Sequence, residues 1–250
     1  ETGETREVTY RQLHREVNTF AAVLQRLDVG RGDRVVIYMP NMAEAVFAML
    51  ACARIGAVHS VVFGGFAAHN LALRIDDAEP KLLIAADAGC RGGRVIPYKG
   101  LVDEACARAK APPPHVLIVS RGLDPAQPRV EGRDVDYATL RADVGDAGVP
   151  VEWLESNEPS YLLYTSGTTG KPKGVQRDVG GYAVAMAQSM RTIFDCAPGQ
   201  VMFSTSDVGW AVGHSYNVYA PLIGGCTSVL YEGLPVNPDP GIWWSLCEKY

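Results

Sequence analysis

The sequence of 250 residues has no long hydrophobic run and no run of basic residues. Its longest uninterrupted apolar stretch, residues 45–53, is much shorter than the roughly 20 residues that cross a bilayer, so no transmembrane helix is predicted. Lys and Arg number 23 against 28 Asp and Glu, which gives a formal net charge of −5. This balance excludes the electrostatic footprint of a general nucleic-acid or anionic-membrane binder. Any anionic ligand must instead be held by a local group of residues.

Cysteine and histidine are scarce and widely spaced. The six cysteines stand at positions 52, 90, 106, 196, 226 and 247, and the five histidines at 14, 59, 69, 115 and 214. Zinc sites use ligand pairs a few residues apart, and this spacing is missing, so no protein-held metal site is predicted. Several cysteines sit inside apolar runs, so we expect buried reduced thiols rather than disulfides, and with them a cytoplasmic location.

The composition is that of a folded enzyme, and both ends suggest a longer chain. Charged residues make up 20% of the sequence and hydrophobic residues 47%, which excludes intrinsic disorder for most of it.

The polar start, residues 1–7, is unlike a secretory leader and has no initiating methionine. Near the other end, the Asp-Pro pair at 239–240 predicts a helix whose pattern still continues at the last residue. We therefore expect a piece of a larger protein, with Trp243 and Trp244 of this helix packed in the core.

The hydrophobic pattern predicts alternating helices and strands. Two capping-box patterns, Thr9 with Gln12 and Asn41 with Glu44, predict helices near 10–27 and 42–55. Short β-branched runs predict buried strands at 34–39, 58–63, 81–86 and 115–119. This alternation predicts βαβ units and a mainly parallel sheet.

A proline-rich and glycine-rich stretch over 112–159 interrupts this pattern around a single strand. We expect one lobe over about 1–120, a second over 158–250, and an irregular segment over 121–157 that joins them. In the second lobe the pattern predicts strands at 161–164, 201–205 and 226–231 and a helix at 182–194.

The segment at 164–174 carries the clearest chemical signal. It reads Tyr-Thr-Ser-Gly-Thr-Thr-Gly-Lys-Pro-Lys-Gly, so glycines, hydroxyl donors and two lysines follow a predicted strand, as polyphosphate-binding loops do. Pro172 stands where a Walker A loop has Ser or Thr, which disfavours a P-loop kinase or NTPase. Because proline also prevents a helix from beginning at Lys171, we expect a glycine-rich clamp rather than a helix N-terminus at the phosphates. The alternative is a surface turn built from small residues.

Residues 165–174 resemble the signature of the adenylate-forming superfamily, which includes acyl-CoA synthetases, luciferases and peptide-synthetase adenylation domains. Segments 60–66, 153–157, 175–182 and 206–216 look like the short-chain acyl-CoA synthetase branch. The resemblance spans essentially the whole chain. It implies an α/β fold of two stacked αβ lobes with mainly parallel sheets, as part of the large N-terminal AMP-binding domain. The family's small C-terminal domain would follow after residue 250.

The resemblance implies an ATP-dependent ligase that works in two steps. A carboxylate would attack the α-phosphorus of ATP to give an acyl-adenylate and pyrophosphate, and the thiol of coenzyme A would then displace AMP. The expected partners are small molecules: propionate (with acetate or another short-chain acid as the alternative), ATP and coenzyme A, with Mg²⁺ as cofactor. In this family the adenine contacts and the adenylation lysine lie in the part that follows residue 250. No catalytic residue is therefore assigned, and a fragment that is inert alone is the non-enzymatic alternative.

The same resemblance implies binding roles for three groups of residues. The residues expected to hold the ATP phosphates are Thr165, Ser166, Gly167, Thr168, Thr169, Gly170, Lys171, Lys173 and Gly174. Those expected at the nucleotide end of coenzyme A are Arg91, Gly92, Gly93 and Arg94, for which an ordinary basic turn is the alternative. Those expected at the acyl group are Trp210, Ala211 and Val212.

Some positions depart from the family pattern or leave two roles open. Ala211 stands where acetate and propionate enzymes usually have valine, so we expect a slightly roomier acyl pocket. Val212 and Val236 replace polar residues of the acetate enzymes, which puts two contacts with coenzyme A in doubt. For three residues of the 206–216 motif a structural role is as plausible as a catalytic one: Asp207, His214 and Tyr216.

Overall fold

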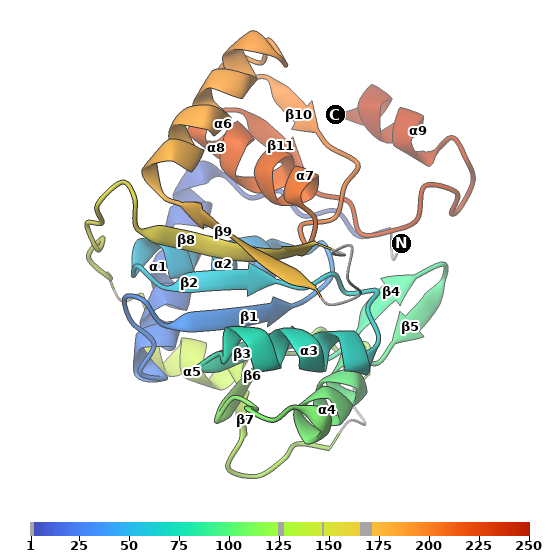
Figure 1. Cartoon of the computed structure of the whole chain (residues 1–250). Helices are drawn as coiled ribbons and strands as arrows, with labels where there is room; N and C mark the ends of the chain where they lie inside the picture. The colour runs from blue at the N-terminus through green and yellow to red at the C-terminus, as the bar shows by residue number, and fades with distance from the viewer. Residues whose placement is uncertain (1–2, 125–127, 147, 166–171) are drawn as a thin grey trace.

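A seven-stranded sheet lies at the centre of the computed structural model, which describes residues 3–124, 128–146, 148–165 and 172–250 (Figure 1). The strand order is β7-β6-β3-β1-β2-β8-β9, and every neighbouring pair is parallel except the β8–β9 hairpin. The strands are β1 (Arg34–Tyr38), β2 (Val58–Val61), β3 (Leu82–Ala86), β6 (His115–Val119), β7 (Asp134–Asp136), β8 (Pro159–Thr165) and β9 (Lys173–Asp178). The expected mainly parallel α/β architecture is confirmed.

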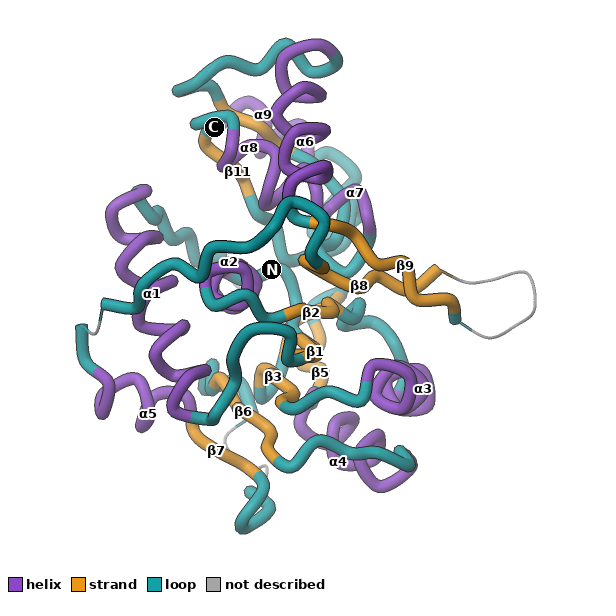
Figure 2. The backbone as a smooth tube through the Cα atoms, turned by 60° about the vertical axis from the view of Figure 1, so that its left-hand side comes forward, coloured by secondary structure: helices purple, strands orange, loops and turns teal. Residues whose placement is uncertain are grey.

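Helices cover both faces of this sheet (Figure 2). One face carries α1 (Tyr10–Arg26), α2 (Ala43–Arg54) and α5 (Tyr137–Val144), and the other carries α3 (Ala68–Ala78) and α4 (Tyr98–Arg108). The central strands β1 and β3 are therefore covered twice, and residues 35–38 and 82–86 are at most 1% exposed. Strands buried on both faces need continuous apolar runs, which is why the sequence predicted them well.

A smaller α/β unit, built from the chain after β9, stands above the sheet (Figure 1). In this unit β10 and β11 form a two-stranded parallel sheet. Separately, a short antiparallel hairpin, β4–β5, projects from the large sheet. The hairpin consists of β4 (Gly89–Arg91) and β5 (Arg94–Ile96). The smaller unit consists of α6 (Gly180–Thr192), β10 (Val201–Phe203), α7 (Ala211–Gly213), the π-helix η1 (His214–Tyr219), α8 (Ala220–Ile223), β11 (Thr227–Val229) and α9 (Ile242–Lys249). Its small core contains Met186, Met190, Ala220 and Cys226.

The two predicted capping boxes have different outcomes. At α1 the prediction is confirmed, because the Thr9 hydroxyl accepts from the Gln12 backbone N–H while Gln12 Oε1 accepts from the Thr9 N–H at 2.8 Å. At α2 it is wrong, since the N-cap residue is Met42 and no side chain caps the helix. Asn41 instead donates through Nδ2 to the Tyr231 carbonyl and accepts at Oδ1 from Val208 N–H, both at 3.0 Å. Its amide therefore links the large sheet to the smaller unit.

The segment expected to be irregular over 121–157 contains regular structure. β7 pairs with β6 at the edge of the large sheet. α5 begins at Tyr137, and the side chain of the N-cap residue Asp136 accepts from Thr139 N–H at 2.9 Å. In addition, β8 and β9 belong to the large sheet although they lie in the range expected for the second lobe. β7 has only one apolar residue, Val135, so its sequence gave no strand signal.

The last helix differs from the prediction of core packing. No residue of α9 is fully buried, and Trp244 is 76% exposed. Trp243 instead faces the cavity described below. Among the helices that the structure describes, none is long and apolar enough to cross a bilayer.

Candidate functional site

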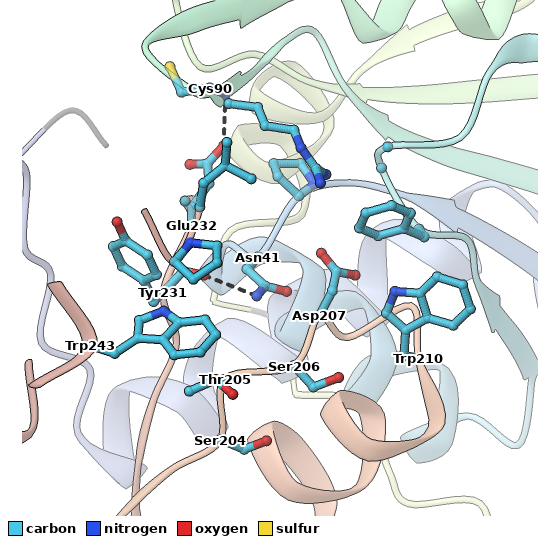
Figure 3. A pocket seen from close by; sticks show the side chains of 18 of the residues that line it. Asn41, Cys90, Ser204, Thr205, Ser206, Asp207, Trp210, Tyr231, Glu232 and Trp243 are labelled. Carbon is cyan, nitrogen blue, oxygen red and sulfur yellow. Dashed lines mark hydrogen bonds between the residues drawn. The ribbon is translucent and has the colours of Figure 1, made fainter. Parts of the chain in front are cut away.

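A cavity of about 290 Å³ opens where the large sheet meets the smaller unit (Figure 3). Pro40, Phe63 and Cys90 reach it from the segments that follow β1, β2 and β3. Residues 204–207 and 231–235 close the other side. The carboxyl ends of parallel strands are the usual place for ligands in open α/β sheets, so the cavity is the candidate site.

The predicted basic turn is the tip of the β4–β5 hairpin. Arg91 pairs with Arg94, and Gly92 and Gly93 between them have φ angles of +60° and +72°. Two positive φ values in succession define a two-residue turn that glycine adopts without strain. Arg91 lines the cavity, whereas Arg94 is exposed on the second strand of the hairpin.

Arg91 is held against an aromatic ring. Its guanidinium carbon lies 5.1 Å from the centroid of the Phe63 ring. Gly65 makes this contact possible, because a Cβ atom there would lie 2.4 Å from the Phe63 ring and 2.8 Å from Arg91 Nη1. The sequence Phe-Gly-Gly-Phe at 63–66 therefore shapes the wall beside Arg91, which the motif alone did not indicate.

The Phe63 ring continues into an aromatic cluster with Trp210. The Trp210 ring centroid lies 5.4 Å from that of Phe63 and 5.8 Å from that of Phe66. The turn that carries Trp210 fits closely, since a Cβ at Gly213 would lie 2.0 Å from the Asp207 carbonyl oxygen. Trp210 is part of the cavity wall, as Figure 3 shows. The other two residues expected at the acyl group, Ala211 and Val212, are exposed and lie outside the lining.

Two carboxylates face the cavity, and sequence reasoning gave neither a binding role. Glu232 forms a paired contact with Arg121, at 2.6 Å and 2.8 Å, and accepts from Cys90 N–H at 3.0 Å. Its charge is therefore balanced. Asp207 accepts from Gly209 N–H at 2.8 Å, and burial raises its pKa to about 6 against the smaller lowering effects of this bond and of Arg91. The cavity thus contains one carboxyl group that changes charge near neutral pH.

The predicted phosphate segment is only partly described. Residues 166–171, which include Ser166, Gly167, Thr168, Thr169, Gly170 and Lys171, lie outside the described residues. Thr165 ends β8, Lys173 begins β9, and the two are partners across the hairpin, with Gly174 opposite Tyr164. Thr165, Lys173 and Gly174 are exposed and are not part of the cavity lining.

A chain of side chains connects this hairpin to the aromatic cluster. Tyr164 donates its hydroxyl to Asp77 Oδ2 at 2.8 Å. The Arg74 guanidinium lies 5.5 Å from the Tyr164 ring centroid and 4.4 Å from that of Phe66. Burial lowers the pKa of Arg74, whose residue is only 6% exposed. The end of the hairpin near Thr165 and Lys173 is therefore packed through α3 onto the ring that supports Trp210.

His214 is a structural residue in this chain, and not a member of the cavity wall. Its Nε2 lies 3.0 Å from Nε2 of His59, and both rings are fully buried between the sheet and η1. Burial lowers the pKa of His59 to about 3 and that of His214 well below its usual value. Both imidazoles are thus neutral at ordinary pH, so that one Nε2 donates and the other accepts. Tyr216 packs on Phe194 with ring centroids 4.6 Å apart.

The described residues do not form a metal-binding cluster of their own. Among them, no group of three or more His, Cys, Asp or Glu side chains is placed to hold a metal ion. The lining of the cavity contains one arginine, two carboxylates, three hydroxyl side chains at residues 204–206 and several aromatic rings.

An open, mainly parallel sheet with a cavity at its strand ends defines an α/β protein of the kind that binds ligands at this edge of the sheet. The chain belongs to the AMP-binding enzyme family, whose model matches residues 2–250.

Relatives of known name match across the whole chain. It is 63% identical over 250 residues to propionate–CoA ligase of Escherichia coli (strain K12). This match covers 100% of this chain and 40% of that protein. It is 46% identical over 248 residues to acetyl-coenzyme A synthetase of Pasteurella multocida, covering 99% of this chain and 38% of the relative. Among solved structures, acetoacetyl-CoA synthetase from Streptomyces lividans matches with a TM-score of 0.88 and 31% identity, over 98% of this chain and 36% of that one. The chain therefore spans about two fifths of the length of these relatives.

Proposed function

We propose that this chain is the N-terminal part of an ATP-dependent short-chain acid–CoA ligase that converts propionate, ATP and coenzyme A to propionyl-CoA, AMP and pyrophosphate. The observation that carries the proposal is the 63% identity to a propionate–CoA ligase over all 250 residues. The cavity supports it independently, because a fixed guanidinium and aromatic walls suit an anionic, slender ligand such as coenzyme A. Acetate is the second candidate acid, since acetyl-coenzyme A synthetases match at 46%. A cytoplasmic location stays a prediction.

In the first step a carboxylate approaches a polyphosphate, so the reaction needs donors and positive charge around the phosphates. Thr165, Lys173 and Gly174 stand at the end of the β8–β9 hairpin where its two strands are connected, and residues 166–171 lie between them in the sequence. Together they would supply hydroxyls, backbone donors and lysines for this purpose. Their role is to hold the β- and γ-phosphates while pyrophosphate leaves.

Mg²⁺ fits this proposal as a companion of ATP. The described residues offer no carboxylate cluster for it, and Mg²⁺ commonly keeps several waters and binds substrate phosphates through few protein ligands. When bound, Mg²⁺ would offset the negative charge of the phosphates. Within the phosphate segment, the hydroxyl oxygens of Thr165 and of residues 166–171 are the side-chain ligands that it would find.

In the second step the thiol of coenzyme A attacks the acyl-adenylate. Arg91 would bind the phosphates at the nucleotide end of coenzyme A, with Gly92 and Gly93 giving access and Arg94 adding charge at the hairpin. Trp210 would pack beside the acyl-adenylate, next to Ala211 and Val212. The rigid cluster of Phe63, Phe66 and Trp210 would keep the two ends of the site in fixed relation.

The test is an assay of the full-length protein with ATP, coenzyme A and propionate, acetate or butyrate. We expect pyrophosphate and AMP, with propionate giving the highest kcat/KM. Formation of ADP would contradict the ligase. A parallel assay of residues 1–250 alone addresses the alternative of an inert fragment, for which we expect no acyl-CoA formation.

A further inference from the structure

Two cysteines from distant parts of the chain meet in the smaller unit. Cys196 lies in the loop after α6, and Cys226 comes directly before β11 and packs against Met186 and Met190 of the same helix. Their Sγ atoms are 3.4 Å apart although 30 positions separate them in the sequence. A disulfide bond measures about 2.05 Å, so the thiols are in contact but not bonded.

The two thiols have unequal surroundings. Cys226 is fully buried among Met186, Met190 and Ala220, whereas Cys196 is partly exposed. Burial, together with the neighbouring Cys196, raises the pKa of the Cys226 thiol to about 11. Of the two, Cys196 is therefore the one that a small reagent in solvent can reach.

The backbone holds Cys226 in place and leaves Cys196 on a loop. The Cys226 carbonyl accepts from the Tyr10 hydroxyl at 2.8 Å, and its N–H donates to the Pro221 carbonyl at 2.9 Å. Cys196 lies outside regular structure, anchored by its N–H to the Met190 carbonyl at 2.9 Å. A small adjustment of this loop can bring the sulfurs to bonding distance without moving β11.

We propose that Cys196 and Cys226 form an oxidation site at which a hydroperoxide converts two thiols to a reversible disulfide that joins the end of α6 to the start of β11. The pair is not part of a metal cluster, since the described residues include no group of three or more potential ligands. Cys90 and Cys247 are the other cysteines of the described chain that are not buried, and both are free thiols.

The chemistry balances with the peroxide as the only oxidant. The Cys196 thiolate attacks one peroxide oxygen, which breaks the O–O bond, forms a sulfenic acid and releases hydroxide. The Cys226 sulfur then attacks the sulfenic sulfur; the S–S bond forms, the S–O bond breaks, and the oxygen leaves as water with the thiol proton. Two thiols and one hydrogen peroxide thus give one disulfide and two waters. A dithiol reductant reverses the step by thiol–disulfide exchange.

The test is peptide mapping of the native full-length protein after brief treatment with hydrogen peroxide, with free thiols then blocked by iodoacetamide. We expect a non-reducing digest to contain a peptide that links Cys196 to Cys226 and that disappears after dithiothreitol. The Cys247→Ser variant, which removes an exposed thiol elsewhere, should keep the linked peptide. Cys196→Ser and Cys226→Ser should each lose it completely.

Recovery of Cys196 and Cys226 only as unlinked peptides, when the peroxide-treated native protein is unfolded and alkylated afterwards, would overturn the proposal. So would a linked peptide that forms only when the protein is unfolded in urea, because the native contact would then play no part. Since the readout is the covalent bond, it is independent of the ligase activity.

Discussion

The guanidinium of Arg91 lies over the ring of Phe63, with its central carbon 5.1 Å from the ring centroid. The contact joins a hairpin that follows β3 to the segment that follows β2, and it places a positive charge at the edge of the cavity. Because Gly65 has no side chain, nothing separates the two groups. The position of the charge therefore depends on a glycine that itself carries no functional group.

Substitution Gly65→Ala tests this arrangement. The new Cβ would lie 2.4 Å from the Phe63 ring and 2.8 Å from Arg91 Nη1, so one of the two must move. We expect the KM for coenzyme A to rise by about tenfold, which corresponds to about 1.4 kcal/mol, within the usual effect of overpacking. The KM for ATP should change little. Steady-state kinetics of the full-length enzyme measure both.

Gly30→Ala is the matched control, because a Cβ at Gly30 meets no atom within 4 Å. An unchanged KM for coenzyme A in Gly65→Ala, at unchanged stability, would contradict a role for the position of Arg91.

The turn below Trp210 gives a prediction about stability. A Cβ at Gly213 would lie 2.0 Å from the backbone carbonyl oxygen of Asp207, and a backbone atom cannot move aside as a flexible side chain can. We expect Gly213→Ala to lower the free energy of unfolding by about 1–3 kcal/mol. Denaturant unfolding of the full-length protein measures it. Gly148→Ala, at a position with no atom within 4 Å of the new Cβ, should change it by less than about 0.5 kcal/mol, and equal losses in the two variants would refute the steric argument.

Asp207 gives a prediction about pH. Burial raises its pKa to about 6, above the usual value near 4, so between these two values the folded state binds more protons than the unfolded state. Its contribution to stability is thus fully present below about pH 4 and is lost as pH rises to about 6. Relative to Asp207→Asn, the wild type should lose up to about 3 kcal/mol over this interval.

The comparison with the Asn variant is necessary because His59 and His214 have lowered pKa values and act in the opposite direction. Their effect is common to both proteins and cancels in the difference. Denaturant unfolding at a series of pH values measures this difference, and parallel profiles for wild type and variant would show that Asp207 does not titrate in this range.

The sequence predicted the central strands because each is a continuous apolar run buried on both faces. It missed β7, whose residues Asp134 and Asp136 flank a single valine at a sheet edge. The Asn41 capping box failed for another reason: the amide is used by Val208 and Tyr231, more than 160 positions away in the sequence. Local patterns cannot report partners at that distance.

The candidate site, like the fold, was predicted from the sequence only in part. Arg91 and Trp210 were predicted from motifs, and both face the cavity. Asp207 was noted without a clear role, and Glu232 was not singled out, because the cavity exists only once segments near 63, 91, 207 and 232 meet. Trp243 was predicted to pack in the core because it is hydrophobic, but its side chain lines the cavity.

Ala211 gives the last prediction, which concerns the choice of acid. It follows Trp210 directly as the first residue of α7 and is exposed in the described chain. The family resemblance implies a larger valine at this position in the acetate and propionate enzymes. If its side chain borders the acyl group, Ala211→Val should lower kcat/KM for butyrate relative to acetate, by at most about 1–3 kcal/mol for the two added methyl groups. Rates with acetate, propionate and butyrate in the full-length enzyme measure the ratio. Ala107→Val, on an exposed position of α4, serves as control and should leave all three rates unchanged. The same ratio in wild type and Ala211→Val would place the determinant of chain length elsewhere, because two methyl groups beside a bound acyl chain cannot be without effect on the longest acid.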